Sequence, residues 1–209
     1  MSKHFTKQSS KQLKQGYSTK ALSWLNLTVC EPEYCESQPH PALDEYFRSR
    51  KKVFVDKLGW EINHFNDRET DEYDNENAYY CIILNNEKLA MAARGHRVGS
   101  PNPGSLIEAL FQLYPDLAVP ISKSDWDVTR LLLHPTLRVP LAQKIIGFRT
   151  LFARHRQRAK SVGCTRMLAV TNPQVPAHFA KIGLRTSRIS RVVKMNENSS
   201  EMAVFAFEV

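Results

Sequence analysis

The sequence is poor in cysteine, in glycine and in long apolar runs, and each shortage excludes a class of protein. No stretch approaches the roughly 18 consecutive apolar residues that a membrane-spanning helix needs. The basic N-terminus is not followed by the apolar segment of a secretory signal. The chain has only 8 Gly and 11 Pro, which excludes a collagen-like or low-complexity protein. We therefore expect no membrane span and no secretion.

The cysteines are too few and too scattered for a disulfide framework, which favours the reducing cytoplasm. They are Cys30, Cys35, Cys81 and Cys164. Cys30 and Cys35 could suggest a metal, but no Cys or His pair elsewhere completes a tetrahedral set, so we predict no metal site.

Acidic residues are also missing from one long segment. Residues 131–195 contain no Asp or Glu and 13 Lys or Arg, whereas residues 61–76 contain seven acids and one base. The net charge is +8 and the isoelectric point is near 9.4. Charge segregated in this way favours an anionic partner, such as nucleic acid, a membrane surface, a phosphorylated cofactor or an acidic protein. A solvated face on a basic protein remains the alternative.

The order of apolar patterns predicts one folded domain over residues 23–209, after a polar and flexible tail at 1–22. We expect a first strand at 25–29, a helix at 41–58, a hairpin at 79–84 and 89–97, and a helix capped by Ser105 that ends at 114. There follow a strand at 126–133, a long helix at 139–162, a strand at 166–171, a helix at 174–182, and strands near 187–195 and 202–209. Strands mixed with helices on both faces predict a three-layer α/β/α sandwich with a mixed sheet.

Four groups of residues could carry chemistry. Arg50 and Phe54 are four apart on one predicted helix and share a face. Leu58-Gly59-Trp60 follows them, and the paired carboxylates of Asp71 and Asp74 lie in the acidic segment. Arg94 comes late in the hairpin. Each of these groups alone also fits an ordinary core or a solvated loop.

The strand Trp126-Asp127-Val128-Thr129-Arg130 is the fourth group. Alternation predicts Asp127, Thr129 and Leu131 on one face of the sheet and Val128 and Arg130 on the other. Burying Asp and Arg in a strand is costly unless the charges are matched, so we expect either structural ion pairs or a site here.

In order and spacing together, these groups resemble the acyl-homoserine-lactone synthase (autoinducer synthase) family of bacterial quorum sensing, from about Arg50 to Leu184. The resemblance implies an acetyltransferase-like (GNAT, acyl-CoA N-acyltransferase-like) fold with a mostly antiparallel sheet. It implies that the amine of S-adenosylmethionine attacks an acyl thioester on acyl carrier protein or coenzyme A. The methionine carboxylate then displaces 5′-methylthioadenosine and closes the lactone. S-adenosylmethionine is a substrate, and no cofactor is expected.

The resemblance also assigns roles. Asp127, Arg130, Asp74 and Arg94 match the catalytic group, with Asp127 as the candidate general base acting through a water. An amine near its free pKa is mostly protonated at pH 7, so some base must take that proton. The residues that match the S-adenosylmethionine-binding group are Arg50, Phe54, Trp60 and Asp71.

Three positions depart from the family's pattern. Asp127 stands where the family usually has Glu, Met91 stands where Gly is common, and the segment after Arg94 differs and carries a short insertion. Arg97 in that segment is therefore a rival for the role assigned to Arg94.

The basic half of the chain then predicts docking of acyl carrier protein, which is strongly acidic. We expect Arg154, Arg156, Arg158 and Lys160 to contribute, although only some of them share a helix face. The predicted acyl pocket consists of Phe148, Phe152, Ala169 and Thr171.

Two other functions fit parts of the sequence. A coenzyme A-dependent N-acyltransferase acting on another amine would share the fold, but it would want a Gly-rich phosphate loop before the long helix, and residues 137–143 contain no Gly. A nucleic-acid-binding module would explain the charge. The sequence has no zinc-finger spacing, RNP-like run or helix-turn-helix signature, so we expect no nucleic-acid partner.

Overall fold

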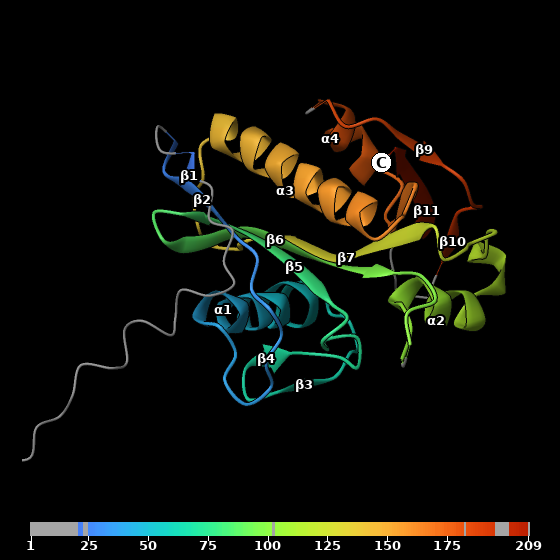
Figure 1. Ribbon diagram of the computed structural model, residues 1–209, viewed down its shortest axis with the longest axis horizontal. Coiled ribbons are helices and arrows are strands. Elements are labelled where there is room, and N and C mark those ends of the chain that lie inside the picture. The colour runs from blue at the N-terminus through green and yellow to red at the C-terminus, as the bar shows by residue number, and fades with distance from the viewer. Residues whose placement is uncertain (1–20, 23–24, 102, 182, 195–200, 209) are drawn as a thin grey trace, which may run out of the picture.

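A computed structural model describes residues 21–22, 25–101, 103–181, 183–194 and 201–208. Helices cover both faces of one large sheet, with α3 and α4 on one side and α1 and α2 on the other (Figure 1). Within the described residues, no helix is long and apolar enough to cross a membrane. Most of the predicted tail, residues 1–20, lies outside the described residues, and its last two residues form β1.

The large sheet is mixed and mostly antiparallel, as predicted. Its order is β1-β2-β5-β6-β7-β8-β11-β10, with β9 also paired to β11. Among the described strands only β7 and β8 pair in parallel. The strands are β1 (Ala21–Leu22), β2 (Leu27–Cys30), β5 (Tyr79–Asn85), β6 (Lys88–Arg97), β7 (Asp125–Leu133), β8 (Arg166–Thr171), β9 (Thr186–Arg188), β10 (Val193–Lys194) and β11 (Glu201–Glu208). A separate two-stranded sheet joins β3 (His64–Phe65) to β4 (Arg68–Glu69).

The helices form the outer layers. The first is α1 (Pro41–Arg50), which continues as one π-helical segment, η3 (Lys51–Lys57); π-helical insertions are frequent at functional sites. The others are α2 (Leu106–Leu113), the short 3₁₀ turn η4 (Pro115–Leu117), α3 (Leu141–Ser161) and α4 (Val175–Lys181).

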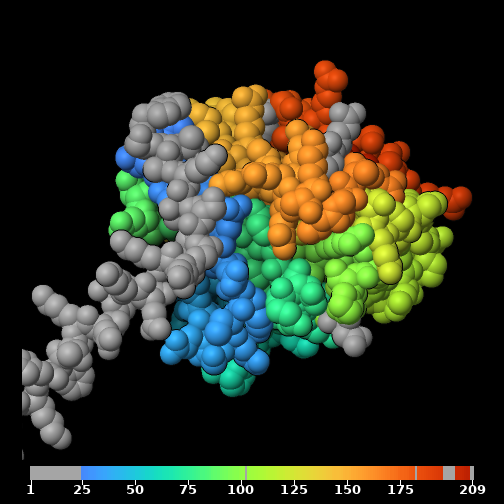
Figure 2. All heavy atoms as spheres, viewed as in Figure 1, coloured from blue at the N-terminus to red at the C-terminus, as the bar shows by residue number. Residues whose placement is uncertain are grey.

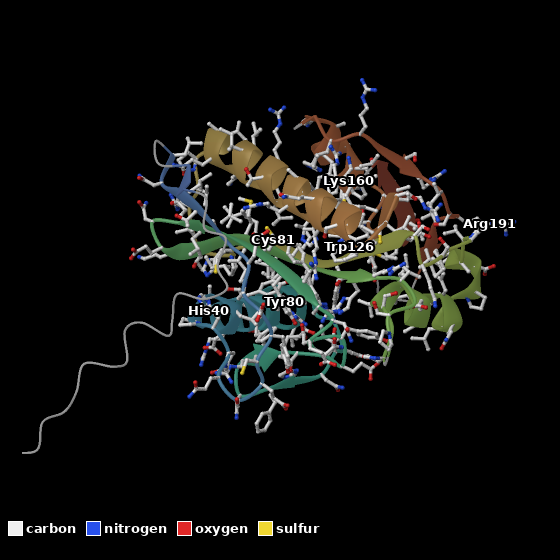
Figure 3. The ribbon with its side chains drawn as sticks, viewed as in Figure 1. His40, Tyr80, Cys81, Trp126, Lys160 and Arg191 are labelled. Carbon is white, nitrogen blue, oxygen red and sulfur yellow. The ribbon has the colours of Figure 1, made fainter. Side chains whose placement is uncertain are left out.

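Three apolar cores fill the spaces between these layers, one against α3, one against α1 and one against α2, because side chains alternate along the strands. Tyr80 points toward α1 and its neighbour Cys81 toward α3 (Figure 3). The Ser105 cap of α2 is present, since the Glu108 carboxylate accepts a hydrogen bond from the Ser105 backbone N–H at 2.8 Å.

Each predicted helix and strand is found, with ends displaced by a few residues. The strand predicted near 187–195 is divided into β9 and β10, and the predicted ends at 182, 195 and 209 lie outside the described residues. The two-residue strands β1, β3 and β4 were not predicted because two residues show no periodicity.

Strands β7 and β8 separate along their length. They pair only from Asp125 to Asp127 against Arg166 to Leu168, and the later residues of the two strands have no register with one another. Helix α3 leaves the end of β7 and returns to the start of β8, so its N-terminus lies at the open end of this separation. A parallel sheet that opens in this way exposes backbone N–H and C=O groups between its strands.

A bulge in β7 reverses the predicted alternation. Ala92 pairs with Leu132 and Arg94 with Thr129, so two residues of β7 oppose the single residue Ala93. The first of the two, Arg130, has a left-handed backbone (φ 52°), as bulges often require. The extra residue turns Arg130 to the same face as Thr129 and moves Leu131 to the α3 core. The predicted faces of Arg130 and Leu131 were therefore wrong.

Candidate active site

Three arginines and three carboxylates meet between α1, the acidic segment and the sheet. We call these six residues the ionic cluster: Arg50, Arg94, Arg130, Glu69, Asp71 and Asp74. Five of them were predicted site residues. They come from α1, β4, the 70–74 loop, β6 and β7, so the fold brings together positions up to 80 residues apart. The formal charges balance, which is what makes burial of so many charges tolerable.

Arg50 lies at the bottom of the ionic cluster with no exposed side-chain surface. Its Nε donates to Glu69 Oε2 and its Nη1 donates to Asp74 Oδ1 at 2.8 Å. Its guanidinium also lies over the Phe47 ring, 5.3 Å from the centroid. Arg50 is thus enclosed by protein groups, and its Nη2, which makes no hydrogen bond to a described residue, lies 3.8 Å from Asp71 Oδ2.

Arg94 is equally buried and binds both acids of the 70–74 loop. It forms a two-point ion pair with Asp71, with Nη2 to Oδ2 at 3.0 Å, and a second ion pair with Asp74 at 2.8 Å. Its Nε donates to Thr129 Oγ1 at 3.2 Å. Tyr80 completes the coordination of Asp74 by donating its hydroxyl at 2.8 Å.

The pKa values follow from these contacts. Burial alone would raise the pKa of Asp74, but Arg50 and Arg94 outweigh it and hold that pKa well below its usual range. The pKa of Glu69 is lowered too, because Arg50 and Arg130 outweigh its burial. Both carboxylates therefore stay ionised at neutral pH.

An aromatic pair stands beside the ionic cluster. The rings of Phe54 and Trp60 stack with centroids 4.8 Å apart and an angle of 18° between their planes. The Arg130 guanidinium lies 5.7 Å from the Phe54 centroid. A flat ring and a charged group can therefore be bound side by side here.

The side chains of the ionic cluster differ in exposure, so that some form a buried floor and others a partly exposed rim. The side chains of Arg50, Arg94 and Glu69 are 0% exposed, whereas Asp71 is 18% and Arg130 9% exposed. Trp60 is half-buried at the same rim. Asp71, Arg130 and Trp60 are therefore placed to touch a ligand, while the buried members hold them in position.

Asp127, the predicted general base, is fully buried beneath the N-terminus of α2. Its Oδ2 accepts a hydrogen bond from the backbone N–H of Ile107 at 2.9 Å. Burial raises the pKa of Asp127 to about 7, opposed by Ile107 and Arg94. A carboxyl group that titrates near neutrality can take up and release a proton during turnover.

The rival hairpin arginines, Arg94 and Arg97, lie in different surroundings. Arg97 is exposed and its Nε donates to the backbone oxygen of Lys123 at 2.7 Å, outside the ionic cluster. Arg94 is the hairpin arginine that meets Asp71 and Asp74.

Sequence reasoning missed Glu69 and Tyr80. Glu69 was counted only as one acid of an acidic segment, although it binds two of the arginines.

The predicted acyl pocket residues share the α3 side of the sheet. Phe148, Phe152 and Ala169 pack in one core, where Phe152 stacks on Phe207 with centroids 5.1 Å apart. Thr171 is half-buried at the end of β8, where β7 and β8 have separated.

The predicted docking residues lie in the last turns of α3. Arg156, Arg158 and Lys160 are exposed, and α3 runs exposed across the face shown in Figure 2. Arg154 is half-buried and pairs with Glu31 at 3.6 Å. This end of α3 lies beside the paired ends of β7 and β8, where His155 accepts a hydrogen bond from Trp126 at 3.2 Å. The open end of the strands lies beside the other end of α3.

Within the described residues, no group of three or more His, Cys, Asp or Glu could hold a metal ion.

Comparison with known proteins identifies the family of the chain. A model described as autoinducer synthase matches residues 35–207, which include the whole ionic cluster and the Phe54–Trp60 pair. The chain belongs to the autoinducer synthase family. The family predicted from the motifs is therefore confirmed.

Individual members of the autoinducer synthase family are similar over different lengths. An acyl-homoserine-lactone synthase of Aeromonas hydrophila is 27% identical over 157 residues, covering 70% of each chain. One from Yersinia ruckeri is 41% identical over 59 residues, which are 28% of this chain and only 27% of that protein. A crystal structure of BjaI, a CoA-dependent acyl-homoserine lactone synthase, with SAM and isopentyl-CoA has a TM-score of 0.64 at 19% identity, covering 80% of this chain and 76% of that one. This likeness confirms the predicted acyltransferase-like fold.

Proposed function

We propose that this member of the autoinducer synthase family makes an acyl-homoserine lactone from S-adenosylmethionine and an acyl thioester. The observation that carries the proposal is the balanced ionic cluster whose rim lies beside a stacked aromatic pair. S-adenosylmethionine carries an ammonium, a sulfonium, a carboxylate and a flat adenine. The rim offers an anion, a cation and an aromatic surface in one place.

In the bound state, the partly exposed carboxylate of Asp71 faces the positive groups of S-adenosylmethionine and Arg130 faces its carboxylate. Phe54 and Trp60 form the wall against the adenosyl group. Arg50, Arg94, Glu69 and Asp74 act as positioning residues, because they lie behind the rim with no room to reach a ligand. Because these residues fix Asp71 and Arg130 in place before the substrate reacts, little reorganisation is needed in the transition state.

The acylation step begins when Asp127 takes a proton from the ammonium, leaving a nucleophilic amine. The amine nitrogen attacks the thioester carbonyl, a C–N bond forms, the C–S bond breaks and the thiolate leaves. The nitrogen gives its second proton to the departing thiolate and Asp127 releases the first to water, so the products are the neutral amide, the free thiol and one proton. Backbone N–H groups between the separated strands β7 and β8 are the candidate donors to the developing oxyanion.

Lactonisation follows on the same substrate. The carboxylate oxygen attacks the γ-carbon, and the bond from that carbon to the sulfonium breaks. Its electron pair stays on sulfur, which leaves as neutral 5′-methylthioadenosine. No cofactor is consumed, because the sulfonium itself is the leaving group.

We propose acyl carrier protein as the donor rather than coenzyme A, on the strength of the basic α3. The acyl chain would lie along Phe148, Phe152, Ala169 and Thr171, next to the separated strands. The four free cysteines suit a reducing cytoplasm as the place of reaction.

Incubation of the purified chain with S-adenosylmethionine and either acyl carrier protein or coenzyme A thioesters tests the proposal. Liquid chromatography with mass spectrometry should detect an acyl-homoserine lactone and methylthioadenosine in equal amounts. An acylated amine without methylthioadenosine would instead support an N-acyltransferase with another acceptor.

A further inference from the structure

His96 and Asp127 are direct cross-strand partners in the β6–β7 ladder, and both side chains are fully buried. Residues directly opposite each other in an antiparallel pair project from the same face of the sheet. Trp126, the neighbour of Asp127, points toward α3 (Figure 3), so Asp127 and His96 face the side that holds the ionic cluster.

Three polar atoms of this pair lack a hydrogen bond of normal geometry in the described part of the chain. One oxygen of Asp127 binds Ile107, but Oδ1 is buried and makes no hydrogen bond to any residue that the structure describes. Both ring nitrogens of His96 are also buried without a hydrogen bond of normal geometry in the described part of the chain. Buried polar atoms are rarely left unpaired, so three of them on facing residues call for a small polar partner.

The surroundings connect this place to the ionic cluster. The Tyr73 ring meets the His96 ring edge to face at 6.4 Å, and the Arg94 guanidinium lies 5.8 Å from the Tyr73 centroid. The charged groups that act on the pair are Arg94, Arg130, Glu108, Asp71 and Asp74.

The protonation states suit a neutral histidine beside a titrating acid. Burial, helped by Arg94, lowers the pKa of His96 to about 4, against the opposing effect of Asp74, Asp71 and the backbone of Tyr73. At pH 7 the ring therefore offers one donor and one acceptor. Asp127, with its pKa near 7, offers an acceptor when ionised.

We propose that His96 is a positioning residue for the acylation step, and that it holds, together with Oδ1 of Asp127, the water through which Asp127 takes the proton of the substrate amine. The water gives one proton to Oδ1 and receives one from the ammonium, so it is regenerated and charge is conserved. This inference rests on the proposed function.

Substitutions of His96 test the proposal in lactone-forming assays. His96→Leu should lower kcat at least about tenfold with little change in KM for S-adenosylmethionine, since general base catalysis contributes about 10²–10⁴. His96→Gln, which keeps a donor and an acceptor, should recover much of the loss. The acid limb of the pH–rate profile should move to higher pH in His96→Leu, because the ionised carboxylate of Asp127 loses the water that donates to it.

A longer carboxylate provides a second, independent test. Asp127→Glu moves the carboxylate toward the water position, so removing His96 from that variant should cost far less than removing it from the wild type. Equal losses in both backgrounds would overturn the proposal. His155→Leu is the matched control, because His155 is also a fully buried histidine but lies on the α3 face, and its loss should leave the pH profile in place.

A measurement without turnover separates failure of this inference from failure of the proposed function. Carbon-13 NMR of labelled aspartate should show the pKa of Asp127 higher in His96→Leu than in the wild type, whether or not lactone forms. If His96→Leu does not fold, His96→Gln takes its place: it should fold, with the pKa of Asp127 near the wild-type value. When His96→Gln is added to Asp127→Glu, the activity of that variant should not change. An unchanged Asp127 pKa in His96→Leu, or a pH profile that does not move, would overturn the role of His96.

Discussion

Arg130 and Glu69, which are 61 residues apart in the chain, form a two-point ion pair. Nη2 of Arg130 lies 3.0 Å from Oε1 and Nε lies 3.1 Å from Oε2. The same Nη2 lies 2.9 Å from Asp71. The pair exists because the bulge in β7 turns Arg130 toward α1, and it ties the two-residue strand β4 to the large sheet.

Arg130→Lys tests the planar geometry of this pair. Lysine keeps the charge but cannot bind Glu69 and Asp71 with a rigid fork. We expect kcat/KM for S-adenosylmethionine to fall roughly tenfold or more, as for loss of a hydrogen bond to a charged group. Steady-state kinetics measures this, with circular dichroism to verify the fold. Wild-type kinetics in the variant would refute the contact of Arg130 with substrate.

Glu69→Ala should unfold the protein more easily than any exposed change in the acidic segment. Removing Glu69 leaves Arg50 paired with Asp74 and Arg130 paired with Asp71, so the buried cluster keeps three arginines against two carboxylates. An uncompensated buried charge typically costs about 3–5 kcal/mol. Urea unfolding measures the difference. Glu61→Ala is the control, since Glu61 is exposed, and it should change stability by less than about 0.5 kcal/mol. Equal effects of the two substitutions would contradict the account.

Most of the fold could be predicted from the sequence because its strands and long helices repeat apolar residues at regular intervals. Arg130 could not be placed correctly, since the extra bulge residue depends on pairing with β6 and leaves no periodic signal. Glu69 was missed because a two-residue strand carries no pattern and its partners come from α1 and β7. Tertiary packing also decides that Asp71 and Arg130 are partly exposed while the other charges of the ionic cluster are buried.

Acid should destabilise the protein partly through Asp74. Its pKa is lower folded than unfolded, so its stabilising contribution is complete above the unfolded value of about 4 and is lost as pH falls toward the folded value. Urea midpoints should fall below about pH 4 in the wild type. Asp74→Asn should be less stable at pH 7 and depend less on pH. Asp67→Asn, an exposed control, should follow the wild-type curve; parallel curves for Asp74→Asn and wild type would count against the ion pairs.

Trp60→Ala should weaken binding of S-adenosylmethionine and methylthioadenosine with the fold retained. Trp60 is half-buried and stacks on Phe54, so its loss removes one wall of the binding site. Stacking contributes about 0.5–1.5 kcal/mol in addition to the burial of apolar surface. Losing it should therefore lower the affinity by about 2- to 13-fold. Isothermal titration calorimetry measures it, and Trp60→Phe should recover most of the affinity. Unchanged binding in Trp60→Ala would place the adenosyl group elsewhere.

Charge reversal on α3 tests the donor. Changing Arg156, Arg158 and Lys160 to Glu should raise KM for acyl carrier protein several-fold without changing kcat, because rim charges act mainly on association. The effect should shrink at high salt. The same change at Arg188 and Arg191, which are exposed on other elements, is the control. Arg138→Glu tests whether acyl carrier protein docks instead at the open end of β7 and β8, where the exposed Arg138 lies. If only this substitution raised KM for acyl carrier protein, the docking surface would lie there and not on the last turns of α3.

The most direct measurement is mass spectrometry of a reaction containing the purified wild-type chain, S-adenosylmethionine and a mixture of acyl thioesters. The account predicts an acyl-homoserine lactone and methylthioadenosine in equal amounts, with neither formed by a folded Asp71→Ala variant. Folded wild-type protein that consumes the thioester without releasing methylthioadenosine would contradict it.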